Sequence, residues 1–148
     1  MIINLINNSS TEFLSNDNNL SILLDTGAFI SVFTKSTELF KILFKDSFDS
    51  GFKTVISGFG GKGTLASVFV IPEVCIGDIK IFNLPVAIQP NKYISNELIL
   101  SAYVFKNNPF TVDYLNKFIN IENGDIWCRY VVTDNDLVKG FSVFTQSL

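Results

Sequence analysis

Asp25 is the acidic residue whose position in the sequence best suits chemistry. It ends the largely apolar segment 20–24 and is followed by Thr26, Gly27 and Ala28. An apolar strand would deliver the carboxylate to a fixed place, and a glycine without a Cβ permits a tight loop after that strand. Two facing carboxylates can share one proton, so that one is an acid while the other is a base. Taken alone, however, the Asp-Thr-Gly tripeptide more often marks a simple turn.

The composition removes most other catalytic chemistry. The 148-residue chain contains no histidine, which excludes serine–histidine and cysteine–histidine nucleophile pairs and histidine metal ligands. Its two cysteines, Cys75 and Cys128, are far apart in the chain and are expected to be ordinary buried thiols. We therefore expect no metal site and no cofactor, and any catalysis must use carboxylates, lysines, hydroxyls or thiols.

Charge and hydropathy limit the partners that we expect. The formal net charge is −3 and the 11 Lys and Arg residues are scattered along the chain, which argues against nucleic acid as a partner. The N-terminal residues lack the basic start of a secretory signal, and the most apolar stretch, 65–72, is much shorter than the ~20 residues of a membrane-spanning helix. We expect a soluble cytoplasmic protein without a membrane partner.

Short β-branched and aromatic runs, separated by Gly, Asn, Asp or Pro, predict an all-β domain. Two short helices are expected at 36–45 and 102–107, with Ser36 and Ser101 as their N-caps. Strands are expected near residues 2–6, 20–25, 30–33, 52–57, 64–71, 73–77, 79–82, 84–89, 97–100, 110–114, 117–122 and 126–132.

Further elements follow Asp25 in a characteristic order. A glycine-rich segment at 58–61 lies between two expected strands, a predicted hairpin follows at 76–86, and an apolar strand leads into the second helix at 98–105. In this order of elements the chain resembles the retropepsin-like aspartic proteases, over roughly residues 2–122. The resemblance rests on the whole series of elements and not on any single motif.

This resemblance implies a closed β-barrel of the acid-protease type over residues 1–123, with a flap hairpin and one short helix late in the domain. Residues 124–148 form an extension whose strands are expected to pack on the same domain or at a dimer interface. Leu100 and Ser101 would support the active-site loop, although the family usually has a glycine in the place of Ser101. The flap residues that would close over a peptide are Gly58, Phe59, Gly60 and Gly61.

The resemblance also implies an aspartic endopeptidase. With one usable Asp-Thr-Gly motif per chain, two chains must form a homodimer so that their Asp25 carboxylates meet at a two-fold axis and activate water. Thr26 would brace the two loops, and Gly27 would contact the backbone of the peptide substrate. The apolar side chains that are candidates to line the cleft, with packing in the core or on the surface of a strand as the alternative for each, are Phe29, Val32, Ile56, Phe59, Val86 and Ile88.

Two other functions stay open at the level of the sequence. A catalytically inactive dimer of the same fold could act as a peptide- or protein-binding module, and Ser101 in the place of glycine motivates that alternative. A small β-barrel that binds an apolar ligand is motivated only by the 14% aromatic content. That barrel would need neither a dimer nor a carboxylate at a strand end.

Overall fold

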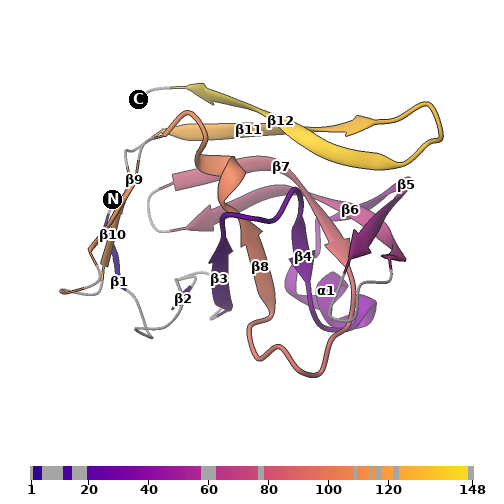
Figure 1. Ribbon diagram of the computed structural model, residues 1–148, viewed down its shortest axis with the longest axis horizontal. Coiled ribbons are helices and arrows are strands. Elements are labelled where there is room, and N and C mark those ends of the chain that lie inside the picture. Colours follow the sequence, from indigo (N-terminus) through magenta and orange to yellow (C-terminus); the bar gives the residue numbers. More distant parts are fainter. Residues whose placement is uncertain are drawn as a thin grey trace.

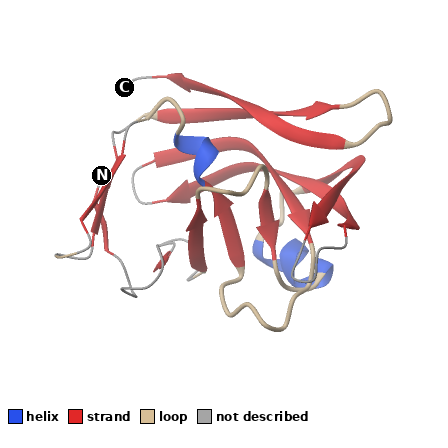
Figure 2. Ribbon diagram, viewed as in Figure 1, coloured by secondary structure: helices blue, strands red, loops and turns tan. Residues whose placement is uncertain are grey.

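The computed structural model describes residues 2–4, 12–14, 20–57, 63–76, 79–108, 110–113, 115, 118–121 and 124–146. Strands make up most of this part of the chain, which confirms the predicted all-β fold (Figure 2). The described helical segments are α1 (Thr37–Leu43) and the short 3₁₀ helix η1 (Ala102–Phe105). The described strands are β1 (Ile2–Asn4), β2 (Glu12–Leu14), β3 (Ser21–Asp25), β4 (Ser31–Phe33), β5 (Phe48–Ser57), β6 (Gly63–Ile76), β7 (Ile79–Ile88), β8 (Leu98–Ser101), β9 (Phe110–Asp113), β10 (Phe118–Ile121), β11 (Asp125–Val132) and β12 (Val138–Gln146).

Strands β3, β8 and β4 lie side by side in the main sheet and carry the loop that follows Asp25 (Figure 1). β3 runs parallel to β8, with Asp25 opposite Ser101. β4 lies on the other side of β8 and runs antiparallel to it. Both ends of the loop between β3 and β4 are therefore attached to the same strand, β8.

Longer strands extend the main sheet on the β4 side. β7 pairs with β4 in parallel and with β6 antiparallel, and β5 forms a hairpin with β6. The C-terminal hairpin of β11 and β12 joins the sheet because β11 pairs in parallel with the beginning of β7. Among the described residues, β1, β10 and β9 form a separate three-stranded sheet.

Aromatic packing fixes α1 against the sheet. Phe40 of α1 is fully buried, and its ring lies edge-on to those of Phe33 and Phe69, with centroids 5.1 Å and 5.5 Å away. The helix begins after Ser36, whose hydroxyl accepts a hydrogen bond from the Leu39 amide over 3.2 Å. The predicted cap is thus confirmed, and it starts the helix where its apolar face meets the core.

Element boundaries differ from the prediction at Pro72 and Asn83. Each was expected to separate two strands, but β6 and β7 continue through them. The two residues face each other between the pairs Ile71–Leu84 and Glu73–Phe82, and Asn83 has a positive φ of 57°. Proline lacks an amide donor, so a strand can continue through it where the ladder is locally interrupted.

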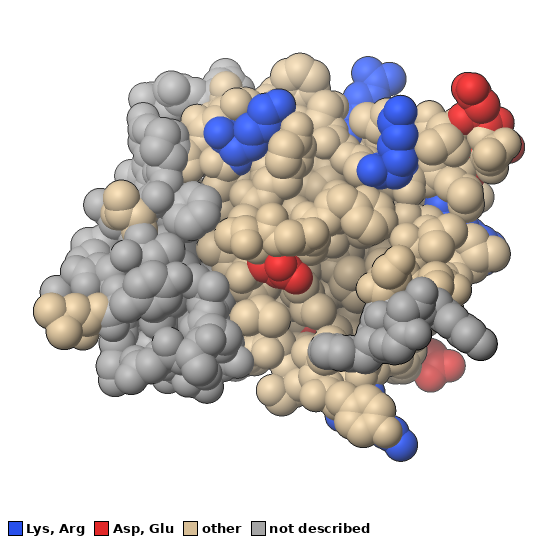
Figure 3. All heavy atoms as spheres, in the orientation of Figure 1, with Lys and Arg blue, Asp and Glu red and all other residues tan. Residues whose placement is uncertain are grey.

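Two further features of the described residues are the distribution of charge on one face and the length of the helices. On the face shown in Figure 3, most of the described surface is neutral, and the Lys and Arg side chains lie at several places on it. No helix among the described residues is both long and apolar enough to cross a bilayer.

Cys128 provides a pH-dependent test of the core. Burial raises the pKa of its thiol from 9.0 to about 12. The folded protein therefore keeps a proton that the unfolded chain releases near pH 9, and the resulting stabilisation is lost as the pH rises from about 9 towards 12. We expect the free energy of unfolding in urea to fall more steeply above about pH 9 for the wild type than for Cys128→Ala. Equal slopes for the two proteins would contradict this account.

Candidate active site

Asp25 lies at the carboxyl end of β3, and its side chain is half-buried. The Gly27 amide donates a hydrogen bond to Asp25 Oδ1 over 2.8 Å. Thr26 and Gly27 themselves are exposed. The turn therefore fixes one carboxylate oxygen while the residues that follow stay accessible to water and to a ligand.

The loop after Asp25 is tied to the end of β8. The hydroxyl of Ser101 donates to the carbonyl of Ala28 over 2.5 Å, and it accepts a hydrogen bond from the Tyr103 amide over 3.3 Å. The Ser101 amide donates to the hydroxyl of Ser31, at the start of β4, over 3.0 Å. One residue of β8 thus contacts the middle of the loop, its exit into β4 and the start of η1.

The structure brings many of the predicted site residues together around this end of β8. These are Asp25, Thr26, Gly27, Ala28, Leu100 and Ser101. Leu100 is fully buried in the core. The predicted flap residues Gly58, Phe59, Gly60 and Gly61 lie outside the described residues. The strands that flank them are paired up to Ser57 and Gly63.

The prediction of an apolar cleft is partly wrong. Phe29 is 44% exposed and is available to a ligand. Val86, Ile56 and Ile88 are buried in the hydrophobic core, so they do not line an open cleft. Val32 is half-buried and packs against a core cluster. The sequence identified these residues as apolar, but it did not show that the sheet is covered where they lie.

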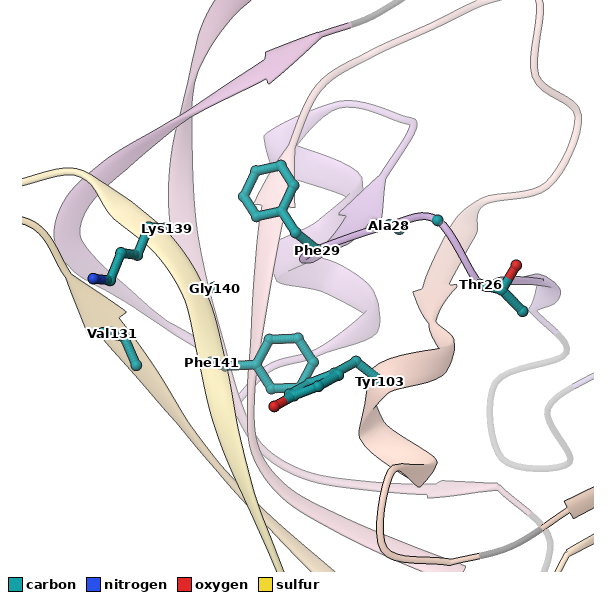
Figure 4. Close-up of a pocket in the computed structure, with 9 residues that line it drawn as sticks. Thr26, Ala28, Phe29, Tyr103, Val131, Lys139, Gly140 and Phe141 are labelled. Atoms are coloured by element: carbon teal, nitrogen blue, oxygen red, sulfur yellow. The ribbon is translucent and has the colours of Figure 1, made fainter.

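A hollow of about 460 Å³ opens beside the loop that follows Asp25 (Figure 4). Its floor is aromatic, because the rings of Tyr103 and Phe141 lie edge-on with centroids 5.4 Å apart. In Figure 4 the ammonium group of Lys139 points away from Phe29, so the aromatic rings dominate the part of the hollow near the loop. The lining residues are Thr26, Gly27, Ala28, Phe29, Tyr103, Val131, Lys139, Gly140 and Phe141.

The C-terminal hairpin forms the wall of the hollow that faces Phe29. Its strand β12 is attached to β5, because the buried hydroxyl of Thr54 donates to the Val138 carbonyl over 2.6 Å. Lys53 and Leu137 also form a parallel β-bridge. Gly140 then passes close to the active-site loop, since a Cβ at this position would lie 3.8 Å from the Phe29 carbonyl oxygen.

Sequence analysis did not identify the contribution of β12 to the site. The aromatic and β-branched residues concentrated over 141–145 could have indicated a strand. Its position beside Phe29 depends on contacts between distant parts of the chain, such as Thr54 with Val138, which no local pattern contains. Among the described residues, no group of three or more Cys, Asp and Glu side chains could hold a metal ion.

Comparisons with known proteins agree with this geometry. A family model described as aspartyl protease matches residues 11–104. Among solved structures, a retropepsin-like aspartic protease from Rickettsia conorii superposes with a TM-score of 0.54 and 16% identity, covering 82% of this chain and 88% of that chain. This likeness confirms the retropepsin-like fold. No curated protein matches the sequence.

Removal of one hydroxyl tests how the hairpin is held. Thr54→Val leaves the buried Val138 carbonyl without its donor, which should cost about 1–3 kcal/mol of stability. We expect amides of β12 to exchange with solvent faster in this variant, as measured by hydrogen exchange. Thr34→Val is the matched control, because the buried Thr34 hydroxyl also donates to a backbone carbonyl over 2.6 Å, that of Asn96. Equal acceleration of β12 exchange in both variants would contradict the local role of Thr54.

Proposed function

This chain belongs to the aspartyl protease family, and we propose that it is an aspartic endopeptidase in which Asp25 is the catalytic residue. The observation that supports this function most directly is the placement of Asp25. Its carboxylate ends a strand of the main sheet, has one oxygen held by the Gly27 amide and lies next to the exposed residues Thr26 and Gly27. An acid held in this way can meet water and a peptide in a defined geometry.

The proposed enzyme is a homodimer, because one carboxylate cannot be the acid and the base at the same time. Each chain supplies one Asp-Thr-Gly motif at the end of an apolar strand. A two-fold axis beside the loop would bring the Asp25 carboxylates of two subunits together. Thr26 is exposed next to Asp25 and would brace the two loops across that axis.

The mechanism follows from a pair of carboxylates that shares one proton. The ionised Asp25 removes a proton from water as the water oxygen attacks the scissile carbonyl carbon. The protonated Asp25 of the other subunit donates its proton to the carbonyl oxygen, which gives a tetrahedral intermediate. Transfer of a proton to the amide nitrogen then allows the carbon–nitrogen bond to break. The enzyme forms no covalent bond with its substrate and requires no cofactor.

The substrate in this proposal is a peptide or protein segment that lies across the loop and the hollow. Gly27 would contact its backbone, and the exposed ring of Phe29 would contact an apolar side chain near the scissile bond. The hairpin of β5 and β6 leads towards the glycine-rich segment at 58–61, which would close over the bound peptide. We place this activity in the cytoplasm.

Asp25→Asn tests the catalytic role. We expect this variant to fold and to lose cleavage of a mixed peptide library by about 10³-fold or more, because an amide can neither take up nor release the required proton. The wild-type rate, scanned from about pH 3.5 to 7.5, should follow a bell centred on the acidic side, as expected for a coupled carboxylate pair. Cleavage is measured by mass spectrometry of the peptide products.

Asp49→Asn is the matched control for this experiment. Asp49 also precedes a hydroxyl residue and a glycine, and its Oδ1 accepts a hydrogen bond from the Gly51 amide over 2.9 Å. It lies near the start of β5, outside the site, so cleavage should persist in this variant. Equal cleavage by wild type and Asp25→Asn would refute the proposed mechanism. Peptide binding without cleavage by the folded wild type would favour the alternative of a binding module.

Mixing of subunits tests the dimer. If each active site needs Asp25 from two chains, a ninefold excess of Asp25→Asn should reduce the activity of a fixed amount of wild type to about one tenth after subunit exchange. The excess variant captures wild-type chains in mixed dimers that lack one carboxylate. A ninefold excess of Asp49→Asn controls for the added protein. If the added Asp25→Asn protein leaves the wild-type activity unchanged, one chain is sufficient for catalysis.

A further inference from the structure

We propose that Ser101 is a positioning residue, whose hydroxyl holds the active-site loop so that Asp25 keeps its catalytic orientation. This inference rests on the proposed function and extends it to a residue that does not touch the substrate. Ser101 occupies a position where the resemblance led us to expect glycine. Its role follows from four features of the structure: its backbone conformation, its burial, its hydrogen bonds and its place opposite Asp25.

The backbone at Ser101 does not require glycine. Its φ and ψ angles of −63° and 123° lie in the extended region that any L residue adopts. The residue is fully buried, so its side chain occupies space that a glycine would leave empty. The serine therefore fits this fold without backbone strain.

The hydroxyl of Ser101 uses both its donor and its acceptor capacity. It donates to the Ala28 carbonyl over 2.5 Å and accepts from the Tyr103 amide over 3.3 Å. A hydroxyl in a buried site with both kinds of partner has one defined orientation. Neither glycine nor alanine at this position could replace the bond to Ala28.

The bond to Ala28 lies close enough along the chain to affect Asp25. Ala28 follows Gly27, whose amide donates to Asp25 Oδ1 over 2.8 Å. Ser101 also lies opposite Asp25 in the parallel register of β3 and β8. The strand pairing fixes the main chain of Asp25. The Ser101 hydroxyl fixes the carbonyl of Ala28, in the part of the loop that follows the Asp25 carboxylate. The side chain of Ser101 thus acts on Asp25 through Ala28 and Gly27.

Ser101→Ala and Ser101→Gly test this role. Both remove the hydroxyl, and the alanine variant keeps the Cβ, so it separates the hydrogen bond from the filled space. We expect kcat to fall about 10- to 100-fold in both variants while KM changes less than about threefold, because small displacements of a catalytic group act mainly on the transition state.

Thr34→Val is the matched control for a lost buried hydroxyl. The Thr34 hydroxyl donates to Asn96 near the opposite end of β8, far along the strand from Ser101. This variant should lose stability and keep the wild-type kcat and KM. An amide-exchange measurement by NMR supplies a readout that does not require activity. The Gly27 amide should exchange at least about tenfold faster in Ser101→Ala than in Thr34→Val, because the loop that carries it is released.

The outcomes separate this inference from the proposed function. If wild type cleaves peptides and the Ser101 variants keep its kcat, the positioning role is refuted while the endopeptidase stands. If Ser101→Gly is as active as wild type but Ser101→Ala is not, the Cβ and not the lost bond is responsible, which also refutes it. If wild type does not cleave, the proposed function fails and with it the catalytic role of Ser101. In that case, if the Gly27 amide exchanges with solvent at the same rate in Ser101→Ala as in wild type, the Ser101 hydroxyl does not hold the loop, and the structural part of the inference is refuted as well.

Discussion

The parallel pairing of β3 with β8 is the constraint on which the candidate site depends. Parallel neighbours end at the same edge of a sheet, so Asp25 and Ser101 come to lie opposite each other. Because β4 pairs with the other side of β8, the chain must cross the end of β8 between Asp25 and Ser31. The loop that presents the carboxylate is therefore held at both ends by one strand, and its middle can be held by that strand's last residue.

The parts of this arrangement that could be predicted are those that depend on neighbouring residues. Asp25 was identifiable because an apolar run, an acid and a glycine are adjacent, and Ser36 was identifiable because a cap acts within one turn. The burial of Val86 was not predictable in the same way. From Leu84 to Ile88 every residue of β7 is buried, so both faces of the strand are covered. An apolar run of this kind does not show which side chains could reach a cleft.

The position of the C-terminal hairpin could not be predicted for a different reason. Of its two strands, only β11 is among the strands expected from the sequence, and the position of both depends on the pairing of β11 with β7 and on the bond from Thr54 to Val138. These contacts join segments far apart in the chain. The hairpin also lies beyond residues 11–104, which match the family. In the proposed enzyme one wall of the hollow beside Asp25 would therefore come from outside the shared region, and the preference for particular substrate side chains need not follow that of relatives.

The interpretation of Ser101 differs between the sequence and the structure. As a departure from the expected glycine, it was the feature that motivated a non-catalytic alternative. In the structure the serine backbone is unstrained, its side chain is buried and its hydroxyl has both a donor and an acceptor partner. The departure thus gives no reason to expect a damaged loop. A glycine would leave the Ala28 carbonyl dependent on other contacts, whereas serine holds it from within the same chain. In the proposed homodimer, a loop held in this way would keep the orientation of Asp25 before the second subunit binds, so that dimer formation would have only to bring two prepared carboxylates together.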